Sequence, residues 1–245
     1  MIKFEFTEVM NFAGAFRGMR NAYESWELSD SEICPNSIGF EDCTSNCGKC
    51  PRDDGSNFDK EVFCIGKNDL ALAQKLIKAG SDHRKFMRQI IVSVDITAPL
   101  YWWKEFDTYK VGTVANSCST MHKIPAKEFT LDNFSTEKLL THGLNVLRYI
   151  INELNDVREL YINGFQGVPG DDSRNIPPKD KRYWWQMIQL LPTSYNQRRT
   201  LTLNYEVLRN IYGSRRNHKL DEWSIGFMKW LDSLPYAEEL IKYEI

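Results

Sequence analysis

The sequence predicts an α+β fold in which a small mixed sheet packs with a helical bundle, as a single domain over 1–245. Only two segments, 1–8 and 88–97, look like strands, whereas many longer segments repeat apolar residues at helical spacing. Hydrophobic residues make up 42% and aromatic residues 13% of the 245-residue chain, which is enough for a core. Few strands among many helices are typical of a small sheet covered by helices.

The N-terminal part of the chain contains a strand, a helix and an insertion. Residues 1–8 alternate between apolar and polar side chains, which is the pattern of a strand. The apolar residues expected on one face are Ile2, Phe4 and Phe6. A helix is expected over 11–26, weakened by two glycines. The segment at about 29–66 is polar, Cys-bearing and without periodicity, which indicates an insertion.

The middle of the chain supplies the second helix and the central strand. Asn68 is the expected N-cap of a helix that ends at Gly80. The apolar stripe of this helix consists of Leu72, Ala73, Leu76 and Ile77. Residues 88–97 are rich in β-branched residues and should form a central strand. Pro99 then stands in the first turn of a short aromatic helix.

The C-terminal half is predominantly helical. From Ser135 a long helix is predicted, with a stripe formed by Leu140, Leu144, Leu147, Ile151 and Leu154. A Gly- and Pro-rich loop over 163–178 precedes an aromatic helix over 178–190. The last predicted helices lie near 199–214, 218–231 and 235–243.

Charge and hydropathy restrict the possible partners. The formal net charge is only −2, so no overall field favours nucleic acid or an anionic membrane. Any bound anion is therefore held by local geometry. The longest apolar runs are far too short to span a bilayer. The first residues alternate like a strand and lack the apolar stretch of a signal peptide, so we expect a cytoplasmic protein.

Planar polar groups accompany the apolar stripe of the helix expected over 199–214. Asn204 and Arg215 share a face with the apolar residues between them, at spacings of four, three and four. Amide and guanidinium groups in such a place suit a phosphate or a flat heterocycle. The alternative is a capped surface helix with solvated arginines. Asn210 follows Asn204 by six residues, about 600° of helical rotation, so the two amides do not point in one direction.

Five cysteines cluster in or beside the insertion. Cys43, Cys47 and Cys50 are spaced as Cys-x3-Cys-x2-Cys, with Cys34 and Cys64 on either side. In a reducing compartment such a cluster suggests a metal before disulfides. Four thiolates satisfy tetrahedral zinc, so we predict a structural zinc held by Cys43, Cys47, Cys50 and Cys64. An iron–sulfur cluster, free thiols and oxidised pairs remain the alternatives.

Two stretches of the chain carry a recognisable order of residues. One consists of Leu191-Pro192, Thr202, Asn204, Leu208, Asn210 and Arg215. The other consists of Ala98-Pro99-Leu100-Tyr101-Trp102-Trp103-Lys104-Glu105-Phe106, Tyr109-Lys110 and Ser117-Cys118-Ser119. Both resemble motifs of the flavin-dependent thymidylate synthase family, and with His83 the resemblance covers roughly 82–223. A start like Arg17-Gly18-Met19-Arg20-Asn21 is similar to that of divergent phage-type members.

The resemblance implies a flavin-dependent thymidylate synthase-like fold and a homotetramer with its active sites between subunits. It implies FAD as cofactor, NADPH and methylenetetrahydrofolate as co-substrates, and dUMP as the nucleotide methylated at C5. The cofactor contacts carried over are His83, Lys110, Asn204 and Asn210. The nucleotide contacts carried over are Glu105, Asn116, Ser117, Cys118, Ser119 and Arg215. No protein nucleophile is implied, so the residues orient the reactants and stabilise charge.

The chain departs from the family pattern at charged positions. The Arg-His-Arg motif of the family falls on Thr108, Tyr109 and Lys110, and a further nucleotide-binding arginine corresponds to Ile188. Because a charge-assisted hydrogen bond contributes about 1.5–3 kcal/mol, these changes weaken a phosphate site by about tenfold or more. Compensating charge could come from Lys110, Lys123, Arg198 and Arg199. Two other functions therefore stay open: a flavin enzyme that modifies another pyrimidine nucleotide, and a non-catalytic protein that binds or sequesters nucleotide.

Overall fold

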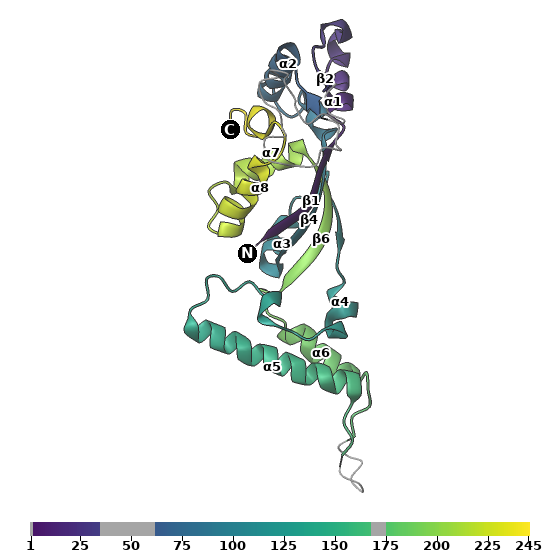
Figure 1. The fold of residues 1–245 in the computed structure, drawn as a ribbon, viewed down its shortest axis with the longest axis vertical. Coiled ribbons are helices and arrows are strands. Elements are labelled where there is room, and N and C mark those ends of the chain that lie inside the picture. Colours follow the sequence, from purple (N-terminus) through teal and green to yellow (C-terminus); the bar gives the residue numbers. More distant parts are fainter. Residues whose placement is uncertain (1, 35–61, 168–174) are drawn as a thin grey trace. The chain divides into compact units, whose positions relative to one another are not determined.

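The computed structural model describes residues 2–34, 62–167 and 175–245. Its strands are β1 (Lys3–Met10), β2 (Glu32–Ile33), β3 (Phe63–Cys64), β4 (Ile91–Pro99), β5 (Val114–Ser117) and β6 (Asn196–Asn204) (Figure 1). Its α-helices are α1 (Phe12–Met19), α2 (Lys67–Lys78), α3 (Leu100–Phe106), α4 (Thr120–Lys123), α5 (Thr141–Asn163), α6 (Lys181–Leu190), α7 (Tyr205–Arg215) and α8 (Met228–Asp232). Two π-helices are η7 (Glu222–Phe227) and η8 (Ala237–Ile241). The 3₁₀ turns are η1 (Asn21–Tyr23), η2 (Trp26–Leu28), η3 (Lys85–Arg88), η4 (Ile124–Ala126) and η5 (Leu131–Asn133).

The main sheet has four strands in the order β1-β4-β6-β5, and β2 and β3 form a separate antiparallel pair. β4 lies between β1 and β6, which confirms the predicted central strand, although it spans Ile91–Pro99 instead of 88–97. Its buried residues alternate, with Val92, Val94 and Ile96 all but inaccessible to solvent. A small sheet among many helices confirms the predicted α+β class. No helix in the described ranges has the length and apolar character that a bilayer crossing requires.

β1 changes its alternation at Phe6. This residue has a φ of 52° and its side chain is 74% exposed. An additional outward residue in the left-handed region is typical of a β-bulge. Directly after it, the Thr7 hydroxyl accepts a hydrogen bond from the Trp230 indole at 3.0 Å. The expectation that Phe6 shares the inner face with Ile2 and Phe4 is therefore wrong, because the bulge reverses the faces.

The helix predicted over 199–214 is wrong in its first part. β6 continues to Asn204, and α7 begins only at Tyr205. Leu201 and Leu203 are buried while the threonines beside them are exposed, which is the period-two pattern of a strand. Asn204 therefore precedes the helix instead of lying on its face.

The start of α2 also differs from the prediction. The N-cap residue is Gly66, and Asn68 lies within the first turn. The Asp30 carboxylate accepts hydrogen bonds from the N–H groups of Asn68 at 2.9 Å and Asp69 at 3.0 Å. A residue distant in the sequence thus caps the helix in place of the local cap that was predicted. Gly80, with a φ of 107°, follows the end of the helix as predicted.

The contacts within the chain divide it into two compact units. Unit 1 comprises Met1–Glu5, Asp95–Thr108 and Ala115–Thr200. Unit 2 comprises Phe6–Val94, Tyr109–Val114 and Leu201–Ile245. The boundaries fall within β1, β4, β5 and β6, so each of these strands contributes residues to both units. The single-domain organisation stays a prediction.

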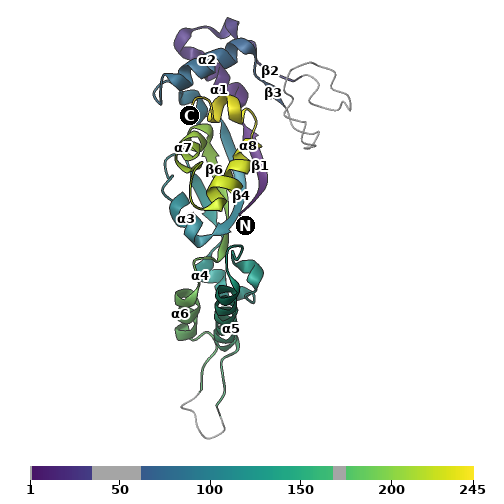
Figure 2. The same cartoon turned by 90° about the vertical axis from the view of Figure 1, so that its left-hand side faces the viewer.

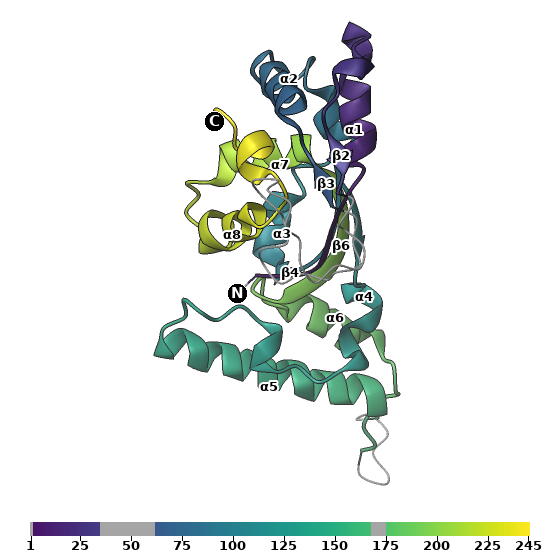
Figure 3. The same ribbon diagram turned by 45° about the horizontal axis from the view of Figure 1, so that its top comes forward.

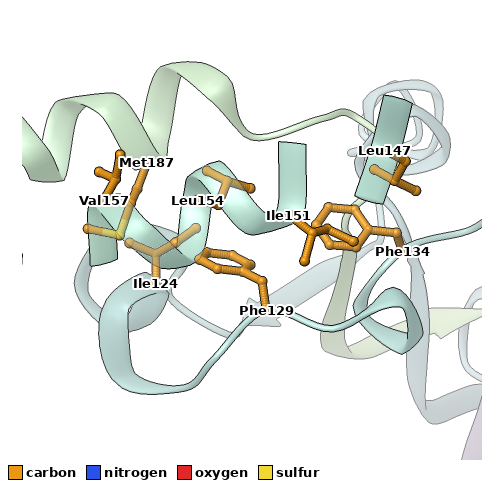
Figure 4. Close-up of a cluster of buried hydrophobic side chains, with 8 residues drawn as sticks. All are labelled: Ile124, Phe129, Phe134, Leu147, Ile151, Leu154, Val157 and Met187. Carbon is orange, nitrogen blue, oxygen red and sulfur yellow. The ribbon is translucent and has the colours of Figure 1, made fainter. Parts of the chain in front are cut away.

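The core of unit 1 forms between α5 and α6, which lie side by side (Figures 1 and 2). Figure 4 shows its buried side chains, which are Ile124, Phe129, Phe134, Leu147, Ile151, Leu154, Val157 and Met187. The α5 residues among them follow the predicted helical spacing. Leu140 does not belong to this stripe, because it precedes the first turn of α5 and is 82% exposed.

Unit 2 contains an aromatic core formed by side chains of α1, β3 and α7, three elements whose ribbons are labelled in Figure 3. The Phe12 ring stacks on Phe63 at 6.0 Å between centroids. The edges of Tyr205 and Tyr236 meet it at 5.6 and 5.8 Å. The Tyr205 hydroxyl donates to the Pro235 carbonyl at 2.6 Å, so the segment after α8 is fixed to the start of α7. This core holds α7 in place within unit 2.

A buried ion pair joins α1 to α2 within unit 2. Arg20 Nε lies 2.5 Å from Asp69 Oδ1, and the two side chains are 4% and 0% exposed. Ser29 also donates to the Asp69 carboxylate, at 2.7 Å. Burial alone would raise the pKa of Asp69, but the hydrogen bonds from Ser31, Ser29 and Arg20 outweigh it and lower that pKa. The pair serves the fold, because its groups are satisfied by each other and by neighbouring serines.

Candidate functional site

The predicted site residues are divided equally between the units, which are described separately. Unit 2 contains His83, Lys110, Asn204, Asn210 and Arg215. Unit 1 contains Glu105, Asn116, Ser117, Cys118 and Ser119.

In unit 2, the loop Tyr109–Val114 lies against α7. Gly112 has a φ of 78°, and a Cβ at this position would be 2.8 Å from Asn204 Nδ2 and 3.3 Å from Val207 Cγ2. The loop backbone is therefore pressed against the start of α7, where only glycine fits without strain. Tyr109 contacts Arg215 at the other end of the helix. One loop thus touches both polar residues that frame the predicted stripe.

Asn204 is the N-cap of α7 and is only 8% exposed. Its Oδ1 accepts a hydrogen bond from the Val207 N–H at 3.0 Å, which fixes the side chain in one orientation. The other half of the amide, Nδ2, is the group that faces Gly112. Asn204 therefore presents a pair of N–H donors toward the loop.

Arg215 is the last residue of α7 and lies between two aromatic rings. Its Nε donates to the Tyr109 hydroxyl at 2.9 Å. Its Cζ is 5.7 Å from the Tyr109 ring centroid and 5.2 Å from that of Trp223. Trp223 comes from η7 and is fully buried. We call these three residues the Tyr109–Arg215–Trp223 stack; it gives the guanidinium a defined plane.

Thr113, in the same loop, has an enclosed hydroxyl. Its Oγ1 is buried and has no hydrogen-bond partner among the residues that the structure describes. A buried polar group without a partner costs about 1–3 kcal/mol, so such groups usually mark a place that a ligand or water completes. The hydroxyl lies next in the chain to Gly112, whose backbone faces Asn204.

The other predicted residues of unit 2 are exposed. Asn210 lies on the solvent side of α7, and Lys110 belongs to the loop that touches the helix. His83 lies in the turn after α2, where its N–H donates to the Gly80 carbonyl at 3.0 Å. Its neighbour Arg84 donates to the buried Glu206 of α7 at 2.8 Å. The structure thus brings Asn204, Lys110 and Arg215 to one loop, and leaves Asn210 on another face.

In unit 1, the polar loop from β5 to α4 is exposed over its whole length. It contains the four predicted nucleotide contacts Asn116, Ser117, Cys118 and Ser119. The Ser119 hydroxyl accepts a hydrogen bond from the His122 N–H at 3.2 Å and caps α4. The Cys118 N–H is already used, since it donates to the Arg198 carbonyl at 3.0 Å.

Gln197 of β6 binds this loop through its side chain. Its Nε2 donates to the Cys118 carbonyl at 3.0 Å and to the Thr120 hydroxyl at 2.9 Å. Its backbone carbonyl accepts from the Trp103 indole at 2.9 Å, so α3 is tied to the same strand. The sequence alone did not single out Gln197.

The arginines expected to supply charge to this loop are paired with carboxylates. Arg198 Nη2 lies 2.6 Å from Asp95 Oδ2, and Arg199 Nη1 lies 2.7 Å from Asp107 Oδ1. Arg199 also lies over the Trp103 ring, with its Cζ 4.2 Å from the centroid. The hydrogen bond with Asp95 raises the pKa of Arg198. Hydrogen bonds from Thr200 and then Arg198 lower the pKa of Asp95.

Glu105 is half-buried on α3. Its backbone carbonyl accepts hydrogen bonds from the Thr108 N–H at 3.2 Å and the Thr108 hydroxyl at 2.8 Å. Thr108 therefore stabilises the end of α3, which differs from the cationic role expected for an arginine at this position.

Of the predicted zinc ligands, Cys43, Cys47 and Cys50 lie outside the described residues. Cys64 lies on β3, where it pairs with Glu32 in the antiparallel β2–β3 pair. Cys34 follows two residues after Glu32, so it points to the same face as Cys64. Cys34, Cys64 and Cys118 are free of disulfides. Within the described ranges, no group of three or more His, Cys, Asp or Glu side chains is arranged to hold a metal.

Comparison with known proteins defines the fold class. The chain has the fold of flavin-dependent thymidylate synthases: a crystal structure of thymidylate synthase X from Helicobacter pylori with FAD and dUMP matches 100% of this chain and 99% of its own, with a TM-score of 0.59. A second structure of that enzyme, also complexed with FAD and dUMP, matches 99% and 97%, with a TM-score of 0.58. Sequence identities are 13% and 14%, so the likeness establishes the fold alone. No family model and no curated protein sequence matches the chain.

Sequence reasoning missed three residues that shape these regions: Thr113, Gln197 and Trp223. Trp223 is eight residues from Arg215 and belongs to a π-helix, and no sequence pattern predicted that this helix places it beside Arg215. Gln197 lies just before the helix predicted near 199–214; the alternation Thr200–Leu203, which was interpreted as helical, was the available signal for the strand that contains it. The sequence signal for Thr113 was the preceding residue, Gly112, because a glycine can mark a close approach of the backbone to another group.

Proposed function

We propose that this chain is a divergent, phage-type flavin-dependent thymidylate synthase-like enzyme that methylates dUMP with methylenetetrahydrofolate and NADPH. The observation that supports this most strongly is the full-length likeness to an enzyme solved with FAD and dUMP. A local observation in unit 2 also supports the proposal, because the loop Tyr109–Val114 contacts both Asn204 and Arg215.

FAD fits the polar groups beside α7. The enclosed Thr113 hydroxyl lacks a partner among the described residues, and Asn204 directs N–H donors toward the same loop. These two residues would hold a polar part of the flavin, with His83, Lys110 and Asn210 as its outer contacts. Bound FAD would supply the redox chemistry, accepting hydride from NADPH and reducing the transferred one-carbon group.

Arg215 is the proposed nucleotide contact in unit 2. The guanidinium of Arg215 has a defined plane, which suits an acceptor with two oxygens. The proposed contacts in unit 1 are Glu105, Asn116, Ser117, Cys118 and Ser119. We propose a homotetramer as the active form, so that residues of different subunits complete each site.

A second candidate, a flavin enzyme acting on another pyrimidine nucleotide, is favoured by one specific observation. The two arginines that were expected to supply charge to the polar loop, Arg198 and Arg199, are paired with Asp95 and Asp107. A phosphate at this loop therefore receives less cationic support than the sequence suggests. The same observation is compatible with a protein that binds nucleotide without catalysis.

Purified full-length protein distinguishes these functions. Flavin absorbance, together with deuterium release from C5-labelled dUMP in the presence of methylenetetrahydrofolate and NADPH, is the result expected for the first. Flavin without deuterium release would favour another nucleotide as substrate. A colourless protein that co-purifies with nucleotide would favour sequestration. If neither flavin nor nucleotide binds, all three functions are wrong.

We further propose a structural zinc at the Cys-rich insertion, held by Cys43, Cys47, Cys50 and Cys64. The support comes from the cysteine spacing and from the β2–β3 pair, which places Cys64 and Cys34 on one face. Metal analysis of the purified protein should find about one zinc per chain. Iron with sulfide would favour the cluster alternative, and an absence of metal would contradict both.

A further inference from the structure

Tyr109 links the loop of unit 2 to the end of α7. Its hydroxyl accepts the Arg215 Nε–H at 2.9 Å, and its ring lies 5.7 Å from the guanidinium carbon. The Tyr109 and Trp223 rings meet at 6.3 Å and 64°, so the two aromatic faces are themselves in contact. A directional hydrogen bond and two ring faces therefore both contribute to the placement of Arg215.

The directional bond determines the orientation of the whole guanidinium. The group is rigid and planar, so fixing Nε also fixes the direction of the Nη1–Nη2 edge. A flexible arginine must lose side-chain freedom when it binds an acceptor at two points. An arginine that is already oriented loses less, and its binding partner gains affinity for that reason.

The support beneath this arrangement is rigid. Trp223 is fully buried and packs against the Phe227 ring at 5.2 Å within η7. Arg215 and Tyr109 are both half-buried, so the stack extends from the core of unit 2 to its surface. A side chain at such a boundary can contact a ligand while its base stays fixed.

The adjacent arginine provides an internal contrast. Arg216 Cζ lies 5.4 Å from the Tyr212 ring, so it too contacts an aromatic face. Among the described residues, however, Arg216 has no hydrogen bond to the Tyr212 hydroxyl. The combination of bond and stacking distinguishes Arg215 from its neighbour.

We propose that Tyr109 is a positioning residue that orients Arg215 for nucleotide binding. This inference rests on the proposed role of Arg215 as a nucleotide contact. It assigns a purpose to a tyrosine at which the chain departs from the Arg-His-Arg pattern of the family it resembles. The phenol does not replace a lost charge; it directs the charge of Arg215.

A double-mutant cycle tests the proposal, with the dUMP dissociation constant of full-length protein measured by calorimetry. Tyr109→Phe keeps the ring and removes the acceptor, and should weaken dUMP binding about tenfold. Arg215→Lys keeps the charge but has no Nε–H. In the Arg215→Lys background, Tyr109→Phe should therefore change the affinity less than about twofold. Tyr212→Phe is the matched control and should bind dUMP like the wild type.

A second measurement reports on orientation without ligand. The Arg215 Nε–H resonance should exchange slowly with water in the wild type and rapidly in Tyr109→Phe, while both proteins keep the same unfolding temperature. If wild-type protein does not bind dUMP, the proposed function and this inference both fail. If it binds dUMP and Tyr109→Phe binds equally well, only this inference is wrong. An equal tenfold loss in both backgrounds also contradicts it, because the tyrosine would then act independently of Arg215.

Discussion

The two units use arginine in different ways. In unit 1, Arg198 and Arg199 lie on β6 and are paired with carboxylates at 2.6 and 2.7 Å. In unit 2, Arg215 is fixed by a phenol and two aromatic rings. A carboxylate partner offsets the charge of an arginine, whereas contacts with a phenol and with ring faces orient it. Counting cations near a predicted phosphate loop therefore overestimates the charge available to a ligand.

This difference changes what each region can contribute. The polar loop of unit 1 can offer hydroxyl groups and backbone N–H groups, but the Cys118 N–H already donates to Arg198. In unit 2, the loop Tyr109–Val114 and the adjacent helix α7 together present the oriented Arg215 guanidinium, the Asn204 amide and the enclosed Thr113 hydroxyl. We therefore expect removal of Arg215 in unit 2 to affect binding most, and removal of Arg199 in unit 1 to affect mainly stability.

The largest expected effect is that of Arg215→Ala on nucleotide binding. The loss of charge-assisted hydrogen bonds, each worth about 1.5–3 kcal/mol, should weaken dUMP binding about fiftyfold. Arg216→Ala is the matched control, because the neighbouring arginine also lies over a tyrosine ring. It should stay within about twofold of the wild type. Equal losses in the two variants would show that net charge, and not the orientation of Arg215, determines affinity.

Arg199→Ala is the corresponding test of an arginine in unit 1. This residue bridges Asp107, Gln197 and the Trp103 ring, so its removal should reduce the free energy of unfolding by about 1–2 kcal/mol. The dUMP affinity of the folded variant should stay within about threefold of the wild type. Denaturant unfolding and calorimetry on the same preparation measure both quantities. A large loss of affinity without a loss of stability would place Arg199 in the binding site instead.

Gly112→Ala tests the contact between the loop and α7. The variant combines a positive φ with a Cβ that would meet Asn204 Nδ2 at 2.8 Å. We expect it to reduce the free energy of unfolding by about 2 kcal/mol. Gly80→Ala is the control, because its φ is also positive but no atom lies within 4 Å of the added Cβ. It should cost about 1 kcal/mol from backbone strain alone. If the two variants are equally stable, the loop does not press on Asn204 in solution.

Gln197→Ala should have a smaller effect, most visible in the polar loop of unit 1. The change removes the hydrogen bonds to the Cys118 carbonyl and the Thr120 hydroxyl and the bond accepted from Arg199 Nε, which should together cost about 1 kcal/mol. Hydrogen exchange should become faster in the peptide that contains Cys118 and Thr120. Cys118→Ser serves as the control, since it leaves the backbone carbonyl in place. Unchanged exchange in Gln197→Ala would mean that the loop is held by other contacts.

Local patterns in the sequence predicted most of the fold. The β-branched run of β4 and the stripe from Leu147 to Leu154 on α5 fold as expected, because each element buries its own periodic residues. The errors arose where distant residues intervene. Asp30 caps α2 from outside the helix, and the bulge at Phe6 reverses the faces of β1. Such effects depend on tertiary contacts, which cannot be inferred from a short segment of sequence.

The candidate site was predictable only in part for the same reason. Asn204 and Arg215 were found from their spacing and from a family resemblance, although Asn204 proved to be a cap instead of a residue on the helix face. Tyr109 and Arg215 are 106 positions apart, and their bond could not be inferred from either segment alone. The pairing of Arg199 with Asp107, 92 positions away, escaped prediction in the same way.

The smallest expected effect concerns the pH dependence of the Asp95–Arg198 pair in unit 1. The pKa of Asp95 is lowered by its hydrogen bond with Thr200 and then by Arg198. When folding lowers the pKa of a carboxyl group, the ionised group stabilises the folded protein at pH values above its unfolded-state pKa, which is about 3.9. This stabilisation is lost as the pH falls through the folded-state pKa. Wild type should therefore exceed Asp95→Asn in stability at neutral pH, and the difference should vanish in strong acid. Thr200→Val should shrink the difference by removing the largest cause. A difference that persists below the folded pKa would mean that shape, and not charge, makes Asp95 stabilising.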